Sequence, residues 1–306
     1  MPATPELPRL RWGRTRAARA AAYLEAGEGR RVVFLHGWGL SHRAYRQSLR
    51  RIAADGVHVP APALPGCSGT AGLPSDECTL EGYAGWLVSF LDAMGIEEPV
   101  LLVGHSFGGG VAIRAAHDHP DRVGGLVLVN SIGGAVWSGE GELARPLTDR
   151  PLWDWGLHVS RDLGSIGARV TRVLPVMLAE AVPNLVFDPR AFLRSARLAR
   201  DADLTEELGA LHRRGLPVVV VWAPRDGVIT EASFAALKDA LRGARTITVP
   251  GGHNWLLADP DRFGEVITNV VEVADRTRWL RRGRARRQWH RLRERIRTAV
   301  PPARAE

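Results

Sequence analysis

A serine stands between glycines at the point where an apolar run meets a stretch that can form a helix. Residues 100–103 are Val-Leu-Leu-Val, a run of strand length, and residues 104–108 read Gly-His-Ser-Phe-Gly. Residues 109–116 are mostly small or apolar and can pack closely as a helix. A turn this sharp forces Ser106 into a strained backbone conformation, and glycine neighbours let strand and helix approach each other. The pattern predicts a strand, a tight turn and a helix, with the serine hydroxyl at the tip of the turn.

A serine hydroxyl becomes a useful nucleophile when a base takes its proton and a carboxylate orients that base. Residues 217–222 have the pattern of a buried strand, and Asp226 follows its carboxyl end, where catalytic residues of parallel sheets collect. His253 lies in a glycine-rich loop after the short strand expected over residues 245–249. The order serine, acid, histidine is the one that accompanies an elbow of this kind. We therefore expect Ser106, Asp226 and His253 to form a catalytic triad.

Other polar residues near these segments have simpler interpretations. Asp201 and Asp203 are alternative acids, but they lie in a charged helical region rather than after a strand. His36 and His105 flank the reactive loops, and we expect each to pack and form hydrogen bonds locally rather than transfer protons. Cys67 lies near the predicted site, where a packed thiol is a simpler interpretation than a reactive one because no base is adjacent in sequence.

A second glycine loop follows the strand expected over residues 31–35 and reads His-Gly-Trp-Gly over residues 36–39. A loop at this place can aim a backbone N–H at a reacting carbonyl oxygen. The residue after the nucleophile supplies the second donor in an elbow of this kind. We therefore expect the backbone N–H groups of Trp38 and Phe107 to form an oxyanion hole.

Together these segments resemble the α/β-hydrolase-fold enzymes, in particular an esterase-like group with a helical cap. The resemblance runs from about residue 22 to residue 274 and includes the Leu-Pro-Gly turn at residues 64–66. Members of the group commonly read Asp-Leu-Pro-Gly-His-Gly there, whereas residues 63–68 of this chain read Ala-Leu-Pro-Gly-Cys-Ser. That loop carries no triad residue, so the departure bears on subfamily and substrate rather than on the basic chemistry.

The resemblance implies a hydrolase that cleaves an ester, or a related thioester, amide or C–C bond, of a small apolar substrate through an acyl-enzyme. It implies no metal and no organic cofactor. The same architecture also hosts cofactor-free perhydrolases of the haloperoxidase type and hydroxynitrile lyases. Some proteins of this fold are small-molecule receptors in which hydrolysis is incidental. These alternatives stay open, because a fold by itself does not decide function.

Strands alternate with helices over residues 20–132 and 209–275, which predicts a mostly parallel sheet covered on both faces. At its start, residues 20–25 and 32–35 can pair as a hairpin around a Gly-Glu-Gly turn. From residue 133 to residue 208 the alternation stops, and prolines interrupt an apolar segment. We expect short helices without sheet strands, forming an all-helical cap over the serine. One or two of its tryptophans should face the substrate, and the candidates are Trp137, Trp153 and Trp155.

The basic charge of the chain is concentrated at its C-terminal end. Residues 276–306 carry 12 arginines against two glutamates, a net charge of +10, whereas the rest of the chain carries −2. Trp289, Leu292 and Ile296 recur there at helical spacing. A basic amphipathic helix suits an anionic membrane surface or an acidic partner. Nucleic acid is electrostatically compatible but has no other support in the sequence. A solvated tail is the simpler alternative.

Two cysteines, Cys67 and Cys78, are too few for a disulfide framework. The first 20 residues lack an apolar stretch of signal length, and the sequence holds no run of about 20 apolar residues that could span a bilayer. We therefore expect a cytoplasmic protein, held at a membrane periphery if the basic tail binds lipid.

Overall fold

The computed structural model describes residues 7–16, 18–138, 145–149 and 170–272. The chain divides into two compact units, Met1–Glu265 and Val266–Glu306. Residues 266–272, the described part of the second unit, are helical. The predicted basic tail lies outside the described residues, as do Trp153 and Trp155. In the described part of the chain, no helix is both long enough and apolar enough to cross a membrane.

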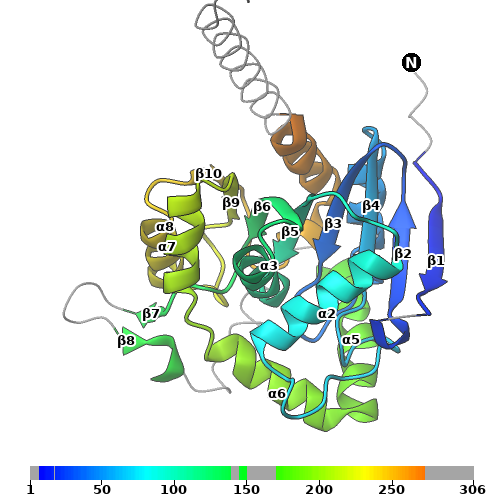
Figure 1. The fold of residues 1–306 in the computed structure, drawn as a ribbon, viewed down its shortest axis with the longest axis horizontal. Helices are drawn as coiled ribbons and strands as arrows, with labels where there is room; N and C mark the ends of the chain where they lie inside the picture. Colours follow the sequence, from blue (N-terminus) through cyan, green and yellow to red (C-terminus); the bar gives the residue numbers. More distant parts are fainter. Residues whose placement is uncertain (1–6, 17, 139–144, 150–169, 273–306) are drawn as a thin grey trace, which may run out of the picture. The chain divides into compact units, whose positions relative to one another are not determined.

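An eight-stranded sheet forms the centre of the first unit, with the order β1-β2-β4-β3-β5-β6-β9-β10 (Figure 1). The first two strands pair antiparallel with their neighbours, and all pairs from β4 to β10 are parallel. The predicted mostly parallel sheet is therefore confirmed. Its strands are β1 (Leu10–Arg14), β2 (Ala22–Ala26), β3 (Arg30–Leu35), β4 (Val57–Pro62), β5 (Val100–His105), β6 (Val123–Val129), β9 (Val218–Trp222) and β10 (Arg245–Thr248).

The expected hairpin between the strands now labelled β2 and β3 is wrong, because β4 lies between them in the sheet. Residues 32–35 of β3 are buried on both faces, which suits a central strand with a parallel neighbour on each side. Strand β2 alternates between buried and half-buried residues, which suits a position near the edge. The short connection between β2 and β3 would favour a hairpin, but the burial of β3 on both faces places it between two parallel strands instead.

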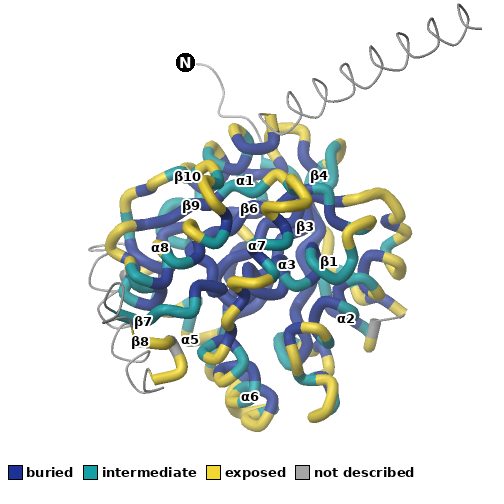
Figure 2. The backbone as a smooth tube through the Cα atoms, turned by 60° about the vertical axis from the view of Figure 1, so that its left-hand side comes forward, coloured by how far each residue is buried: buried dark blue, intermediate teal, exposed yellow. Residues whose placement is uncertain are grey.

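Helices cover both faces of the sheet. Helices α2 (Leu80–Ala93), α3 (Phe107–Asp118), α7 (Thr205–Arg214) and α8 (Glu231–Ala240) form one layer, while α1 (Arg46–Ala53), α9 (Trp255–Ala258) and the helical residues 260–265 belong to the other. Figure 2 shows the buried residues gathered along the central strands and α3. This unit also contains two short 3-10 turns, η1 (Ala18–Ala20) and η3 (Leu147–Asp149).

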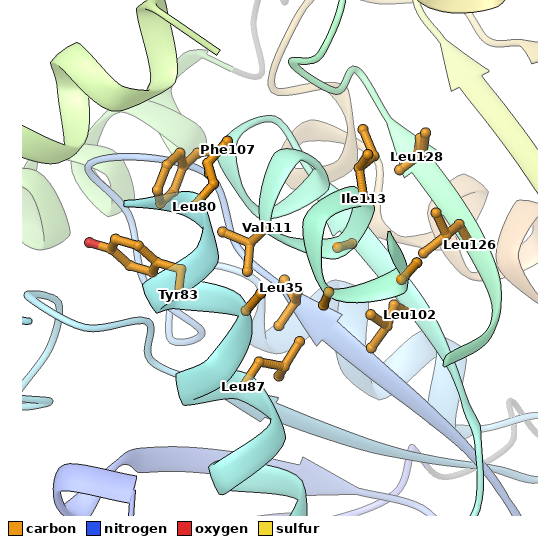
Figure 3. Close-up of a cluster of buried hydrophobic side chains, with 14 of the residues drawn as sticks. Leu35, Leu80, Tyr83, Leu87, Leu102, Phe107, Val111, Ile113, Leu126 and Leu128 are labelled. Carbon is orange, nitrogen blue, oxygen red and sulfur yellow. The ribbon is translucent and has the colours of Figure 1, made fainter. Parts of the chain in front are cut away.

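Successive strand residues point to opposite layers, as the twofold period of a strand requires. Figure 3 shows the first layer, where Leu35, Leu102, Leu126 and Leu128 of the sheet meet Val111 and Ile113 of α3 and Tyr83 and Leu87 of α2. Phe34 points the other way, and its ring lies 4.9 Å from the ring of Tyr45 and 6.1 Å from that of Phe263. The sheet therefore has an apolar layer on each face.

The segment expected to form the cap contains two long helices, α5 (Val170–Phe187) and α6 (Pro189–Arg200). It also contains β7 (Val136–Ser138) and β8 (Arg145–Pro146), which pair antiparallel, so the expectation that this segment holds no strand is wrong. Pro175 and Pro183, which were expected to separate short helices, both lie inside α5. Helix α7 spans the expected boundary at residue 208 and packs against α3 and α8.

Candidate active site

Ser106 occupies the turn between β5 and α3, with φ 53° and ψ −117°. A positive φ is strained for a residue with a side chain, and such strain concentrates at functional sites. Glycines make the turn sterically feasible. A Cβ at Gly104 would lie 2.5 Å from the carbonyl oxygen of Gly108, and a Cβ at Gly108 would lie 2.4 Å from that of Leu35. The sequence pattern therefore folds as the elbow that it predicts, with Ser106 at the N-terminus of α3.

Asp226 follows β9, and His253 follows β10, so the parallel strands bring both residues to one edge of the sheet. The Nδ1 atom of His253 lies 2.8 Å from Oδ2 of Asp226. The other carboxylate oxygen, Oδ1, accepts hydrogen bonds from the backbone N–H groups of Val228 (2.7 Å) and Ile229 (2.8 Å). The Asp226 side chain is fully buried. These contacts fix the carboxylate so that Oδ2 faces the imidazole.

Asn130 also contacts Asp226, and sequence reasoning missed it. Its Nδ2 donates to Oδ2 of Asp226 at 2.5 Å, and its Oδ1 accepts from Nε1 of Trp255 at 2.9 Å. Because an indole N–H can only donate, the amide oxygen must face Trp255 and the amide nitrogen must face the carboxylate. Asn130 comes directly after the buried strand β6. The signal that pointed to Asp226, a polar residue at the carboxyl end of a strand, could have found Asn130 as well.

Ser106 and His253 open into one cavity of about 340 Å³. The glycine loop after β3 borders it, because a Cβ at Gly37 would lie 3.3 Å from Cβ of Ser106. Trp38 also lines the cavity. The Phe107 N–H lies in the first turn of α3, where N–H groups have no intrahelical acceptor. The predicted oxyanion donors thus belong to the two segments that flank the serine.

The indole of Trp38 also joins this loop to the cap segment. Its Nε1 donates to the carbonyl oxygen of Phe192 at 3.0 Å, and the two rings lie 4.4 Å apart. Helix α5 adds further contacts, because Asn184 donates to the carbonyl oxygen of Gly39 at 3.3 Å and accepts from the N–H of Ser68 at 3.0 Å. The cap helices are thereby tied to the loops that border the cavity.

The rest of the cavity wall is mainly apolar. Of the three tryptophans expected there, Trp153 and Trp155 lie outside the described residues. Trp137 is not among the described lining residues, because it lies on β7, which packs against α8. Apolar side chains line the wall from α5 (Met177, Ala181), from α6 (Phe192, Leu193, Ala196) and from the core loops (Leu40, Val228).

Two titratable residues of the loops that follow β3 and β4 are held neutral. Burial lowers the pKa of His36 to about 4. Its Nε2 accepts from the N–H of Leu64 at 2.9 Å, so Nδ1 carries the hydrogen and donates to the carbonyl oxygen of Gly37 at 2.9 Å. Burial, with a smaller contribution from the charge of Glu180, raises the pKa of Cys67 to about 12. His36 is therefore a local structural residue, as expected, and Cys67 is a thiol rather than a reactive thiolate.

Comparison with known proteins agrees with this architecture. Residues 32–266 match the model of a family described as the alpha/beta hydrolase family. The chain therefore belongs to the alpha/beta hydrolase family, and it is an enzyme of the hydrolase type. Among solved structures, bromoperoxidase from Bacillus anthracis has a TM-score of 0.69 at 17% identity, covering 86% of this chain and 100% of that one.

Two curated relatives match over most of their length. A provisionally named non-heme haloperoxidase of Mycobacterium phage D29 is 28% identical over 256 residues, which are 79% of this chain and 87% of the relative. The pimeloyl-acyl-carrier-protein methyl ester esterase of Aromatoleum aromaticum is 27% identical over 262 residues, which are 78% of this chain and 97% of the relative. The names of these similar proteins include both an esterase and a haloperoxidase.

Proposed function

We propose that this chain is a serine hydrolase that cleaves an ester, or a related thioester, amide or C–C bond, of a small apolar substrate. One observation carries the proposal. Ser106, at a strained elbow, shares a cavity with His253, whose Nδ1 is hydrogen-bonded to the buried carboxylate of Asp226. The similar methyl ester esterase supports the choice of an ester as the reacting bond.

In this proposal the Ser106 hydroxyl oxygen attacks the substrate carbonyl carbon while Nε2 of His253 takes the hydroxyl proton. The N–H groups of Trp38 and Phe107 stabilise the negative charge that develops on the carbonyl oxygen. When the tetrahedral intermediate collapses, the ester C–O bond breaks and His253 returns the proton to the leaving alcohol. Water then attacks the acyl-enzyme by the same route, which releases the acid and restores Ser106. Asp226 orients His253 and stabilises the imidazolium.

The cavity wall supports an apolar acyl group. Apart from histidine, no ionisable side chain is found among the described residues that line the cavity, whereas Met177, Phe192 and Leu193 all contribute to it. An anionic substrate group would be left without a positive partner in this part of the site, and burying an unpaired charge is costly. A neutral acyl chain or small ring is the better match.

A perhydrolase is the second candidate, because a haloperoxidase is among the relatives and a bromoperoxidase among the similar structures. In that reaction hydrogen peroxide replaces water as the attacker of the acyl-enzyme, and a peracid leaves instead of an acid. Both reactions form the same acyl-enzyme. They differ in whether water or hydrogen peroxide then attacks it. Bromination of an indicator that requires both acetate and hydrogen peroxide would favour the perhydrolase.

A panel of p-nitrophenyl esters from acetate to octanoate tests the proposal. We expect the wild-type protein to hydrolyse at least one ester and Ser106→Ala to lose roughly 10³-fold or more in kcat. Ser48→Ala is the matched control, because that buried hydroxyl donates to the carbonyl oxygen of Leu256 on the other side of the sheet. The proposal is wrong if Ser106→Ala and Ser48→Ala retain the same rate.

A further inference from the structure

A chain of hydrogen bonds joins three loops that meet at the cavity. The backbone nitrogen of Gly37 lies 3.3 Å from the hydroxyl oxygen of Tyr45, and that oxygen lies 2.9 Å from Nδ1 of His105. The Nε2 atom of His105 lies 3.1 Å from the carbonyl oxygen of His253. Gly37 belongs to the predicted oxyanion loop, His105 directly precedes Ser106, and His253 carries the predicted base. One side-chain pair therefore bridges all three parts of the proposed catalytic apparatus.

The chemistry of the end groups fixes the direction of every hydrogen bond in this chain. The carbonyl oxygen of His253 can only accept, so Nε2 of His105 carries the ring hydrogen and Nδ1 is bare. A bare ring nitrogen accepts, so the Tyr45 hydroxyl donates to it. The phenolic oxygen then accepts from the N–H of Gly37. Reversal at either end would leave two donors or two acceptors facing each other, so the chain has one stable arrangement.

Burial keeps this arrangement neutral. Tyr45 and His105 are both almost completely inaccessible to solvent. Burial, helped by the charge of His253, holds the pKa of His105 well below its ordinary value, and burial raises the pKa of Tyr45 above its ordinary value. The Tyr45 ring is also packed between Phe34, at 4.9 Å, and His105, at 5.7 Å. The hydroxyl therefore has little freedom to leave the chain.

We propose that Tyr45 and His105 are positioning residues that hold the oxyanion loop, the nucleophile elbow and the His253 loop in one register. Both ring nitrogens of His105 are used by the chain, so it acts through the loops rather than on the substrate. Tyr45 lies just before α1 and reaches the elbow from the opposite layer of the sheet. The kinetic consequence rests on the proposed function, whereas the hydrogen-bond chain itself does not.

Tyr45→Phe tests the kinetic consequence, because it removes the hydroxyl and keeps the ring. Tyr83→Phe is the matched control, since Tyr83 is equally buried and its hydroxyl donates to the carbonyl oxygen of Pro65 at 3.1 Å, outside the chain. We expect Tyr45→Phe to lower kcat about tenfold or more with KM within about twofold, because misplaced groups act mainly on the transition state. Binding of a boronic acid, which forms a tetrahedral adduct, should weaken by a similar factor. Equal kcat values for the two variants would overturn the positioning role.

The tautomer of His105 tests the proposed hydrogen-bond chain without any substrate. Nitrogen-15 NMR of the wild-type side chain should show a neutral ring with hydrogen on Nε2 at pH 7 and also at pH 6.5, where an ordinary histidine is about half protonated. In Tyr45→Phe the Nδ1 resonance should move to the position of a ring nitrogen without a hydrogen bond. A charged ring, or hydrogen on Nδ1, would overturn the chain. If the wild-type protein hydrolyses no ester but shows the expected tautomer, the proposed function is wrong and the hydrogen-bond chain is still supported.

Discussion

At Asp226 a single buried carboxylate accepts four hydrogen bonds. Two come from backbone N–H groups to Oδ1, and Oδ2 accepts from Asn130 and from His253. A carboxylate removed from water needs this many donors, since an unpaired buried charge is costly. The imidazole consequently carries its hydrogen on Nδ1, facing Asp226. Nε2 is left as the atom that can accept a proton from Ser106.

Asp226→Asn tests this arrangement at the scale of one residue. We expect kcat to fall by about 10³- to 10⁴-fold with a much smaller change in KM, because an amide also permits the wrong imidazole tautomer. Asp203→Asn is the control. Asp203 is exposed and accepts from the N–H of Thr205 at 3.0 Å, so it serves as a local cap of α7. Steady-state kinetics of both variants on one ester measure kcat and KM. Near-normal turnover in Asp226→Asn would contradict the proposal that Asp226 orients His253.

At the scale of elements, the close approach of β5, β3 and α3 makes the elbow rigid. A Cβ at Gly108 would lie 2.4 Å from the carbonyl oxygen of Leu35 and 2.6 Å from that of His36. Both are backbone atoms next to the predicted oxyanion loop, so neither can swing aside. Any larger residue at position 108 must therefore push α3 and the Ser106 turn away from that loop.

Gly108→Ala should accordingly destabilise the protein by roughly 1–3 kcal/mol, the usual cost of overpacking, and lower esterase activity more than tenfold. Gly85→Ala provides the matched control within a helix. A Cβ at Gly85, in the interior of α2, would meet nothing within 4 Å, so this change should stabilise the protein by up to about 1 kcal/mol. Urea unfolding of both variants measures the difference. Equal stability would show that the elbow tolerates a side chain.

Local sequence patterns were enough to predict most helices and strands. The wrong predictions concern features that depend on contacts between distant parts of the sequence. The order β5, turn, α3 could be predicted because apolar period and glycine spacing are properties of adjacent residues. The partner of β2 could not, since β4, which follows β3 in the sequence, lies between β2 and β3 in the sheet. Prolines suggested breaks in the cap, yet α5 continues through Pro183, and its neighbour Asn184 is held by Gly39 and Ser68 of the core.

The same distinction between local patterns and distant contacts applies to the candidate site. Ser106, Asp226 and His253 follow strands in sequence, so the edge at which they meet could be predicted. The cavity wall could not, because Met177 and Phe192 reach it only through the packing of α5 and α6 over the core loops. Asn130 also follows a strand, so its place at this edge could have been predicted, but its contacts with Asp226 and Trp255 could not. The role of Tyr45 depends on contacts across the sheet layers, which no local pattern records.

At the scale of the whole molecule, three buried histidines make the folded state sensitive to acid. Burial lowers the pKa of His36 to about 4, that of His42 to about 3, and that of His105 well below its ordinary value. Each histidine takes up a proton when the chain unfolds below about pH 6.5, so the unfolded state binds more protons and stability rises with pH. Stability should therefore fall as the pH drops from about 6.5 towards 4, and at pH 5 His36 and His42 should each lower it by about 2 kcal/mol.

His42→Phe isolates one of these contributions. Nδ1 of His42 is buried and has no hydrogen-bond partner among the described residues, and its ring lies 5.6 Å from that of Trp12. Phenylalanine can keep the ring contact and cannot take up a proton. The loss of unfolding free energy between pH 7.5 and pH 5.0, measured with urea, should shrink by about 2 kcal/mol in the variant. An unchanged loss would mean that His42 does not titrate on unfolding in this range.

The basic tail, residues 276–306, lies outside the described residues, and its role stays a prediction from charge. A chain that ends at Asp275 should keep its esterase activity and lose binding to anionic vesicles, because each arginine near a charged membrane contributes about 1 kcal/mol. Replacing Arg281, Arg282, Arg286 and Arg287 by glutamine in the full chain gives a second test. Vesicle sedimentation at low and high salt measures the binding. If all forms bind equally, the tail is not a membrane anchor.

The proposed function depends above all on Ser106 as the covalent nucleophile. Its most direct test is reaction with a fluorophosphonate, followed by intact-mass measurement and peptide mapping. We expect one adduct per chain, on Ser106, and none in Ser106→Ala. Labelling of Asp226→Asn should be much slower, since the serine would then lack an oriented base. An adduct on another residue, or equal labelling of Ser106→Ala, would contradict the proposal.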